Sequence, residues 1–319
     1  MLGQNRLDRH DAGHLSIVTQ VPVTRDLARG ALACPGMGSQ PARVARGLVR
    51  ASHAAPAVVV TGLATALAAA LGSPAGTVAL VALAVGTGQL SVGWSNDWID
   101  AARDVAVGRR DKPVVAGLVT AGTLRGCAFG ALTVCVAASL ALGVAAGATH
   151  LVAVAGAWAY NARLKATVWS WLPYAASFGL LAVCVVLAAP GPRVPAPWAV
   201  AAAALLGVGA HVANTLPDLE DDAATGVRGL PHVLGRRASG VLAPALLLAA
   251  AAVVVTGPAG PPTVVAWAGG ALAAVLALAA GGTALTRPRS RAPFGLGMAV
   301  AVVCVVLLAQ ATADIAVAP

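Results

Sequence analysis

Two short segments carry most of the acidic side chains of this sequence. Residues 97–111 and 218–222 together hold eight of the 12 Asp and Glu residues. The first segment overlaps the run NDWIDAARD at 96–104, and the second ends the run NTLPDLEDD at 214–222. Carboxylate and amide oxygens grouped in this way can bind a hard divalent cation.

The spacing within each run places its polar side chains on one face of a helix. Asn96, Asp100 and Asp104 repeat at i, i+4 and i+8, and Asp97 lies three residues before Asp100. Residues three and four apart are neighbours on a helix surface, so these oxygens would face the same way. The second run repeats the pattern with Asn214, Asp218 and Asp222.

This arrangement favours magnesium and a phosphorylated ligand. Like charges on one helix face repel, and a divalent cation removes that cost. Mg²⁺ takes oxygen ligands and prefers a few carboxylates together with substrate phosphate oxygens. Two facing helices of this kind therefore predict Mg²⁺ ions bound with a diphosphate, whose apolar tail would lie among apolar helices.

Basic residues follow both runs and fit such a ligand. Arg109, Arg110 and Lys112 come after the first run, and Arg228 comes after the second. Each could neutralise a leaving diphosphate through charge-assisted hydrogen bonds. The alternative is that these residues only mark the cytoplasmic side of a membrane, beside lipid headgroups.

The composition indicates that membrane helices carry these runs. The sequence has 58% hydrophobic and 10% charged residues, with a mean hydropathy of +0.81, whereas soluble domains carry about 25% charged residues. This excludes an ordinary soluble enzyme, a disordered chain and a coiled coil. It also argues against nucleic-acid binding despite a pI of 10.4, because the basic residues flank apolar spans. Five Cys without a CxxC pair exclude a disulfide scaffold or a zinc module.

Nine apolar segments are long enough to cross a membrane as helices rising about 1.5 Å per residue. They have no two-residue alternation, so they are not barrel strands, and their small residues allow close helix packing. The segments are 54–72, 77–95, 119–143, 147–162, 171–189, 197–216, 239–257, 263–284 and 295–312. The predicted fold class is an all-α, polytopic membrane bundle.

Basic residues lie almost entirely on one side of this predicted bundle. With nine spans, 20 of the 21 Lys and Arg residues fall on the side of the N-terminal segment, and only Arg193 falls on the other. The positive-inside rule then predicts a cytoplasmic N-terminus and a C-terminus outside the cell membrane. Residues 1–50 are predicted to be a poorly ordered cytoplasmic tail, and residues 51–319 to form the membrane domain.

The two runs and their flanks resemble the UbiA superfamily of intramembrane prenyltransferases. Residues 96–104 fit the NDxxDxxxD motif of that family, and residues 214–222 fit its second motif, DxxxD. Three further segments are similar to family segments, with Gly229 where the family usually has Thr: 109–113, 160–165 and 226–231. The resemblance covers roughly residues 45–315, and the pair of motifs is more specific than either motif alone.

The resemblance implies a fold and a reaction. The fold would be a nine-helix bundle with a central cavity that opens laterally to lipid and with capping segments after the second and sixth helices. Mg²⁺ would bridge both motifs to a prenyl diphosphate. The prenyl group would pass to a lipophilic acceptor, which is an aromatic ring in most of the family.

The resemblance also implies the roles of individual residues. The implied catalytic residues are Asp97, Asp100, Asp104, Asp218 and Asp222. The same five, with Asn96 and Asn214, are the implied metal ligands. The implied substrate-binding residues are Asn96, Arg109, Lys112, Tyr160, Lys165, Asn214 and Arg228.

Two other functions are consistent with parts of the pattern. A UbiA-type terpene cyclase would use the same site without an acceptor, because the substrate's own double bonds capture the cation. A transporter or binding protein for a polyprenyl phosphate would explain an internal duplication but needs no doubled Mg²⁺ site. Asp100 stands where the menaquinone branch usually has Arg, which disfavours that branch. No residue pattern identifies the acceptor.

Several histidines and aromatic residues have two interpretations each. His211, three residues before Asn214, either faces the cavity or is packed and satisfied. His150 is predicted to lie at the outer interface. Trp98 and Tyr160 either line the reacting region, where a ring face favours a cation, or belong to an interfacial belt.

Overall fold

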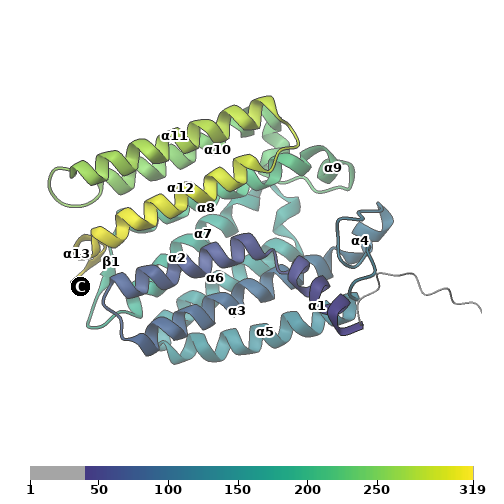
Figure 1. Ribbon diagram of the computed structural model, residues 1–319, viewed down its shortest axis with the longest axis horizontal. Helices are drawn as coiled ribbons and strands as arrows, with labels where there is room; N and C mark the ends of the chain where they lie inside the picture. Colours follow the sequence, from purple (N-terminus) through teal and green to yellow (C-terminus); the bar gives the residue numbers. More distant parts are fainter. Residues whose placement is uncertain (1–39, 319) are drawn as a thin grey trace, which may run out of the picture. The chain divides into compact units, whose positions relative to one another are not determined.

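The computed structural model describes residues 40–318 as a bundle of long helices (Figure 1). The nine long helices in this range are α2 (Ala54–Ala70), α3 (Ala75–Ile99), α5 (Ala121–Ala141), α6 (Val144–Ala162), α7 (Leu172–Leu187), α8 (Pro197–Thr215), α10 (Leu230–Thr256), α11 (Val264–Thr286) and α12 (Ala292–Gln310). The short helices are α1 (Gln40–Ala51), α4 (Ala101–Ala106), α9 (Leu219–Ala224) and α13 (Thr312–Ile315). Three 3-10 helices, η1 (Leu164–Ala166), η2 (Val168–Trp171) and η3 (Leu216–Asp218), and the strands β1 (Val194–Pro195) and β2 (Ala316–Val317) complete the fold. The predicted all-α class is confirmed.

Seven helical segments are long and apolar enough to cross a membrane. They are α3, α5, α10, α11, α12, the segment Val168–Leu187 and the segment Pro197–Ala224. The pair α1 and α2 passes the same test together but is bent by 63°, and would be an eighth span. Helix α6 is not among them, and it carries the polar residues His150, Tyr160 and Asn161. The chain is therefore a multi-pass membrane protein, and the predicted count of nine spans is not confirmed.

Short connections bring successive helices side by side. Thr120 and Thr263 cap α5 and α11 by accepting hydrogen bonds from backbone N–H groups. Pro lies in the first turn of α7, α8, α10 and α12, where no intrahelical donor is lost. Gly143, at φ 102°, forms the tight turn between α5 and α6. Helix α12 returns to pack against α2 and α8, and the main apolar core lies among these helices, α7 and α10.

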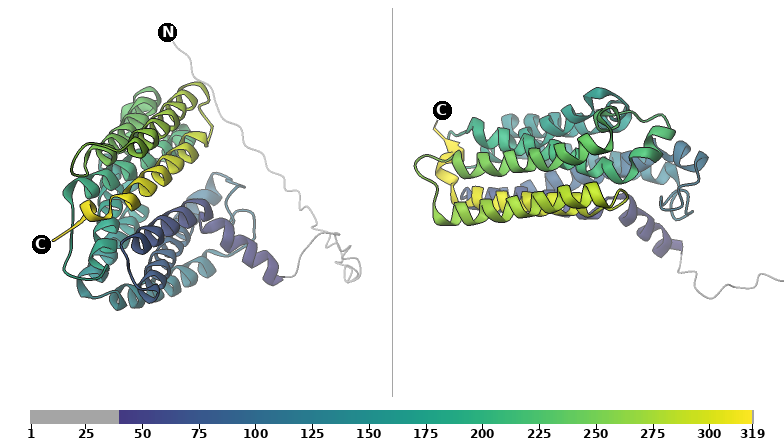
Figure 2. Two further views of the ribbon diagram at one scale, coloured as in Figure 1. Left: turned by 60° about the vertical axis from the view of Figure 1, so that its left-hand side comes forward. Right: turned by 90° about the horizontal axis from the view of Figure 1, so that it is seen from above.

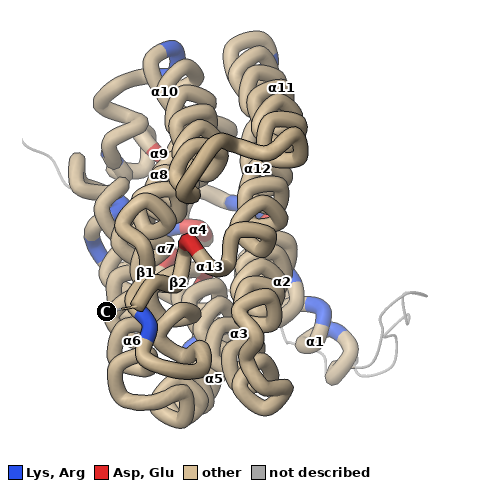
Figure 3. The backbone as a smooth tube through the Cα atoms, turned by 90° about the vertical axis from the view of Figure 1, so that its left-hand side faces the viewer, with Lys and Arg blue, Asp and Glu red and all other residues tan. Residues whose placement is uncertain are grey.

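Contacts between connections define two ends of the bundle (Figures 1 and 2). At one end, β1 pairs with β2, Arg193 reaches the carbonyl of Leu71, and the N–H of Ala259 donates to Asp314. The other end carries α4, α9 and both acidic runs. Figure 3, seen from the end with β1 and β2, has few charged residues in front. The two ends of the fold therefore differ in charge as the sequence predicts, while their orientation in the membrane remains a prediction.

Two helix boundaries differ from the sequence prediction. Residues 40–50 of the predicted tail form α1, so that part of the prediction is wrong, and residues 1–39 lie outside the described residues. The regular structure of α1 follows from packing: a Cβ atom at Gly47 would lie 3.0 Å from Val119 Cβ. Helix α10 begins at Leu230 rather than at 239, because a kink at Gly235 (φ 77°) joins a short first segment, 230–234, to the longer apolar span.

Candidate active site

Asp97 lies near the end of α3 and is 3% exposed. Its Oδ1 atom accepts hydrogen bonds from Lys112 Nζ at 2.9 Å and from Asn96 Nδ2 at 3.3 Å. His53 Nε2 lies 3.4 Å from the same oxygen. His53 stands in the bend between α1 and α2 at φ 50°, which is uncommon for a residue other than Gly. The bend therefore brings a side chain from the start of the bundle onto the first motif.

Asp100 lies between α3 and α4 and contacts two cations. Lys165 Nζ is 2.5 Å and 2.6 Å from its two oxygens, and the Arg103 guanidinium is 3.1 Å from Oδ2. Lys165 belongs to η1, which follows α6. Burial lowers the pKa of Lys165, and the adjacent Asp100 carboxylate opposes that effect. This ion pair links the first motif to the connection after α6.

Asp104 is the most deeply buried acid of the first motif, with 1% exposure. Its Oδ1 atom has no hydrogen-bond partner within the part of the chain that the structure describes. Burial raises the pKa of Asp104; Lys112 opposes this effect, and Asp100 adds to it. A buried oxygen without a partner is costly, so a ligand that supplies positive charge would be stabilised here.

The second motif spans the end of α8, η3 and α9. Asp218 Oδ2 lies 3.6 Å from the Arg109 guanidinium, so this ion pair joins the loop after the first motif to the second motif. Asp222 Oδ2 lies 3.9 Å from His232 Nε2. Glu220 instead accepts a 2.8 Å hydrogen bond from Arg236 Nε of α10. Glu220 is therefore held by a different partner from the acids at the predicted site.

Helix α1 holds the basic loop that follows the first motif. Arg43 donates a hydrogen bond to the carbonyl of Gly117 at 3.3 Å, and Arg50 donates to the carbonyl of Asp111 at 3.0 Å. Burial acts to raise the pKa of Asp111, but hydrogen bonds from Arg109 lower it below its ordinary value. These contacts fix the loop from which Arg109 reaches Asp218.

Ser170 joins the connection after α6 to the start of α10. Its Oγ atom accepts a 2.9 Å hydrogen bond from the Leu230 N–H and lies 3.0 Å from His211 Nε2. Gly229 packs against the same connection, where an added Cβ would come within 2.7 Å of Ser170 Oγ and 2.8 Å of the Lys165 carbonyl. The Gly at 229 therefore allows the close approach that positions Lys165.

Tyr160 and His211 belong to one aromatic group. The Tyr174 ring stacks on His211 at 4.7 Å, and the Tyr160 ring meets both edge-on, at 5.0 Å and 5.6 Å. His211 is 1% exposed, and its Nδ1 atom lacks a partner among the described residues. The ring and Nε2 of His211 are therefore packed and bonded, but Nδ1 is not. The predictions of a packed, satisfied histidine and of a cavity-facing histidine are each met only in part.

Trp98 and His150 also have defined surroundings. Trp98 packs against Phe129 and Trp158, with ring centroids at 5.8 Å and 6.5 Å, which agrees with a packing role. His150 is 4% exposed, so its predicted position at the outer interface is wrong. Gly88 of α3 lies against this ring, and Ser139 of α5 is hydrogen-bonded to it.

The structure brings most of the predicted site residues together, with two exceptions. Asn214 and Arg228 are exposed and make no side-chain hydrogen bond or ion pair with either motif within residues 40–318. Two contacting residues, His53 and Arg103, were not predicted. His53 lies 44 positions from Asp97, so no local spacing reveals it. The i, i+3 spacing of Arg103 from Asp100 could have revealed that pair.

The donor set fits Mg²⁺ together with a phosphorylated ligand rather than alone. Among the described residues, no three Asp, Glu, His or Cys side chains lie close enough to hold a metal ion. Lys112, Lys165 and Arg109 contact the carboxylates instead. Mg²⁺ usually keeps several waters and takes one or two carboxylates plus phosphate oxygens. The free Oδ1 of Asp104 and the oxygen-only donors are compatible with that mode.

Comparison with known proteins gives one family and one fold. A model of the UbiA prenyltransferase family matches residues 57–301. The structure of a UbiA homolog from Archaeoglobus fulgidus, bound to GPP and Mg²⁺, is 14% identical with a TM-score of 0.65, and the match covers 83% of this chain and 98% of that chain.

Two further solved structures have the same fold. The apo structure of a UbiA homolog from Aeropyrum pernix K1 is 20% identical with a TM-score of 0.63, over 79% of this chain and 96% of that chain. The Archaeoglobus fulgidus homolog bound to DMAPP and Mg²⁺ is 16% identical with a TM-score of 0.61, over 82% and 99%. A search of curated proteins finds no match.

Proposed function

The chain belongs to the UbiA prenyltransferase family, and from this premise we propose that it transfers a prenyl group from a prenyl diphosphate to a lipophilic, aromatic acceptor within the membrane, in a Mg²⁺-dependent reaction. The observation that carries the proposal is the ion pair of Arg109 with Asp218, which joins the basic loop after the first acidic motif to the second motif at one end of an apolar bundle. Structures of a homolog with GPP and Mg²⁺ and with DMAPP and Mg²⁺ support it.

In this proposal the acidic motifs hold the ion and the basic residues hold the phosphates. The Mg²⁺ ligands are Asn96, Asp97, Asp100, Asp104, Asn214, Asp218 and Asp222. When bound, Mg²⁺ supplies positive charge to the leaving diphosphate. Lys112, Lys165 and Arg109 exchange their present carboxylate partners for phosphate oxygens, which accept charge-assisted hydrogen bonds. Arg228 approaches from the exposed loop after the second motif.

The proposed reaction breaks one bond and makes another. The bond between the prenyl C1 atom and the diphosphate oxygen breaks, and its electron pair leaves with the diphosphate. A nucleophilic carbon of the acceptor bonds to C1, and the acceptor then loses a proton to water. The cations near Asp97 and Asp100 stabilise the charge that develops on the leaving group. Tyr160, beside this region, offers a ring face to the positive charge on the prenyl group.

An apolar pocket next to the motifs would hold the prenyl tail. It lies between α2, α3, α6 and α7 and includes Val60, Val92, Val154 and Leu181. Aliphatic walls keep water from the reacting carbon, so capture by the acceptor competes better with hydrolysis. A lipophilic acceptor can approach from the surrounding bilayer.

The proposal is tested by product analysis with the full-length protein in detergent. Prenyl diphosphates are supplied with and without Mg²⁺, first without an acceptor and then with a lipid extract that contains aromatic acceptors. We expect Mg²⁺-dependent diphosphate release that requires the extract, and a product whose mass is the acceptor plus the prenyl group. Asp218→Asn should remove turnover, whereas Glu220→Gln, which alters an acid paired with Arg236, should retain it.

Three results would contradict the proposal. A cyclic hydrocarbon or alcohol formed without an acceptor would assign a terpene cyclase. Prenyl diphosphate binding without any turnover would favour a transporter or binding protein. Full activity of Asp218→Asn would place the chemistry elsewhere.

A further inference from the structure

The pocket between α2, α3, α6 and α7 leads away from the acidic motifs along helix faces. On α3, the pocket residues Val85, Gln89 and Val92 continue at helical spacing to Asn96 and Asp100. On α6, the face that starts at His150 reaches Tyr160 and Asn161 in the same manner. The pocket and the acidic site therefore lie one after the other along the same faces of α3 and α6.

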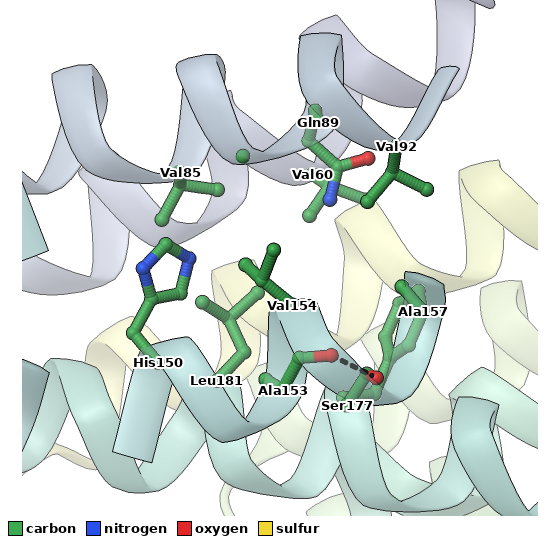
Figure 4. A pocket seen from close by; sticks show the side chains of 12 residues that line it. Val60, Val85, Gln89, Val92, His150, Ala153, Val154, Ala157, Ser177 and Leu181 are labelled. Carbon is green, nitrogen blue, oxygen red and sulfur yellow. Dashed lines mark hydrogen bonds between the residues drawn. The ribbon is translucent and has the colours of Figure 1, made fainter. Parts of the chain in front are cut away.

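His150 closes the end of the pocket that is farther from the motifs. Figure 4 places its ring beside Val85 at one end, with Val92, Ala157 and Ser177 at the other. The ring is packed closely, because a Cβ atom added at Gly88 would lie 3.5 Å from His150 Cε1. Gly88 is therefore the residue of α3 that lies at the same level of the bundle as the His150 ring.

A hydrogen-bond chain fixes the orientation of this ring. Ser139 Oγ lies 2.6 Å from the carbonyl of Cys135 and so donates its proton there. It then accepts the 2.8 Å hydrogen bond from His150 Nδ1. In a neutral imidazole with the proton on Nδ1, Nε2 is an acceptor, and it has no protein partner within the described residues. An apolar group in contact with Nε2 would exclude water from this acceptor without replacing the hydrogen bond, and this costs free energy.

The distance from the first motif to the level of His150 is comparable to the length of a short isoprenoid chain. Nine residues of α3 separate Gly88 from Asp97, which is about 13 Å at about 1.5 Å per residue. An extended five-carbon isoprene unit adds about 5 Å, because each of its four chain bonds of about 1.5 Å advances the zigzag by about 1.25 Å. Two units, at about 10 Å, thus fit between the motif and the level of His150, whereas four units, at about 20 Å, would have to displace the ring or leave the pocket.

We propose that His150 is a specificity-determining residue that limits the prenyl chain to about two isoprene units, through both the volume of its ring and the polar Nε2 atom at the pocket end. This inference rests on the proposed function, because it assumes that the diphosphate lies at the acidic motifs. It adds a substrate class: short prenyl diphosphates.

The test compares affinities, so it needs no acceptor. The dissociation constants of a two-unit and a four-unit prenyl diphosphate are measured with Mg²⁺ for the full-length protein in lipid nanodiscs. The variants are His150→Ala, His150→Leu and the control Thr149→Ala, whose side chain bonds to its own helix at an exposed position. We expect the wild type and Thr149→Ala to bind the two-unit ligand roughly tenfold more tightly. His150→Ala should reduce this ratio to about threefold or less, and His150→Leu should reduce it partly.

The possible failures are distinguishable. Equal affinities in the wild type, or a ratio that neither His150 variant changes, would overturn the inference while leaving the proposed function intact. If His150→Ala does not fold, the ratio measured for His150→Leu decides. Absence of Mg²⁺-dependent binding of either ligand to the wild type, or unchanged binding by Asp218→Asn, would overturn the proposed function, and the inference with it.

Discussion

At the residue scale, the carboxylates of the first motif are held by lysines from other parts of the chain. Lys165 contacts both oxygens of Asp100, and Lys112 contacts Asp97. A cation that is already near the motif loses little freedom when a phosphate replaces the carboxylate. These ion pairs therefore keep the basic residues in place before substrate binds.

Replacement of Lys165 tests this role. Hydrogen bonds to charged groups contribute about 1.5–3 kcal/mol, so Lys165→Met should weaken prenyl diphosphate binding by roughly 10- to 100-fold. The measurement is the dissociation constant with Mg²⁺ present. Arg163→Gln, an exposed position of the same connection, is the control and should change it less than threefold. Equal affinities of Lys165→Met and the wild type would show that Lys165 only neutralises Asp100.

Gly229 differs from the residue usual at this position in the family, and the structure gives a reason that the sequence does not. The departure from the usual Thr is visible in the sequence, but its reason is not. That reason is the approach of Gly229 to Ser170 and Lys165, which lie more than fifty positions earlier in the chain. The acids could be predicted because their helical spacing is local, whereas His53 could not, because the bend between α1 and α2 creates its contact with Asp97.

At the element scale, α1 is part of the site rather than a tail. It contacts the basic loop that follows the first motif through Arg43 and Arg50, and Trp94 Nε1 donates to the carbonyl of Leu48 at 2.9 Å. This helix was not predicted from the sequence, because its polar composition is also typical of an unstructured segment. The nine long helices were predictable from their apolar runs, and their boundaries lie within four residues of the predicted segments except at the start of α10.

The role of α1 can be measured by limited proteolysis. Replacing both Arg43 and Arg50 with Ala removes the hydrogen bonds to Gly117 and Asp111, so the loop should open more often. We expect tryptic cleavage between Arg109 and Lys112 to become at least several-fold faster. Arg46→Ala, an exposed residue of the same helix, should leave the rate unchanged. Equal rates in all three proteins would contradict a role of α1 in holding the loop.

At the scale of the whole molecule, the unequal charge of the two ends predicts the orientation in the membrane. Apart from Arg193, the basic residues of the described part lie in α1, in α4, near the helix ends or in the connections at the end that carries both motifs. The positive-inside rule predicts that the end with both motifs faces the cytoplasm, where soluble prenyl diphosphates would reach it. The apolar helices next to it line the pocket between α2, α3, α6 and α7.

Labelling with a membrane-impermeant thiol reagent tests the orientation. In a background without Cys34 and Cys127, Ser290→Cys should react only when the cytoplasmic face is accessible, and Val194→Cys should react from outside intact cells. The remaining Cys residues of the described part are buried. Labelling of Ser290→Cys from outside intact cells would reverse the predicted topology.

The two acidic motifs are expected to bind a divalent cation together with a diphosphate, and not a cation alone. Mn²⁺ can replace Mg²⁺ at oxygen ligands and is detected by electron paramagnetic resonance. Protein-bound Mn²⁺ is measured after rapid gel filtration, with and without a prenyl diphosphate. The account predicts near-stoichiometric bound Mn²⁺ only when the prenyl diphosphate is present, and its loss in both Asp100→Asn and Asp218→Asn. Equal Mn²⁺ binding without the ligand, or retention in both variants, would contradict it.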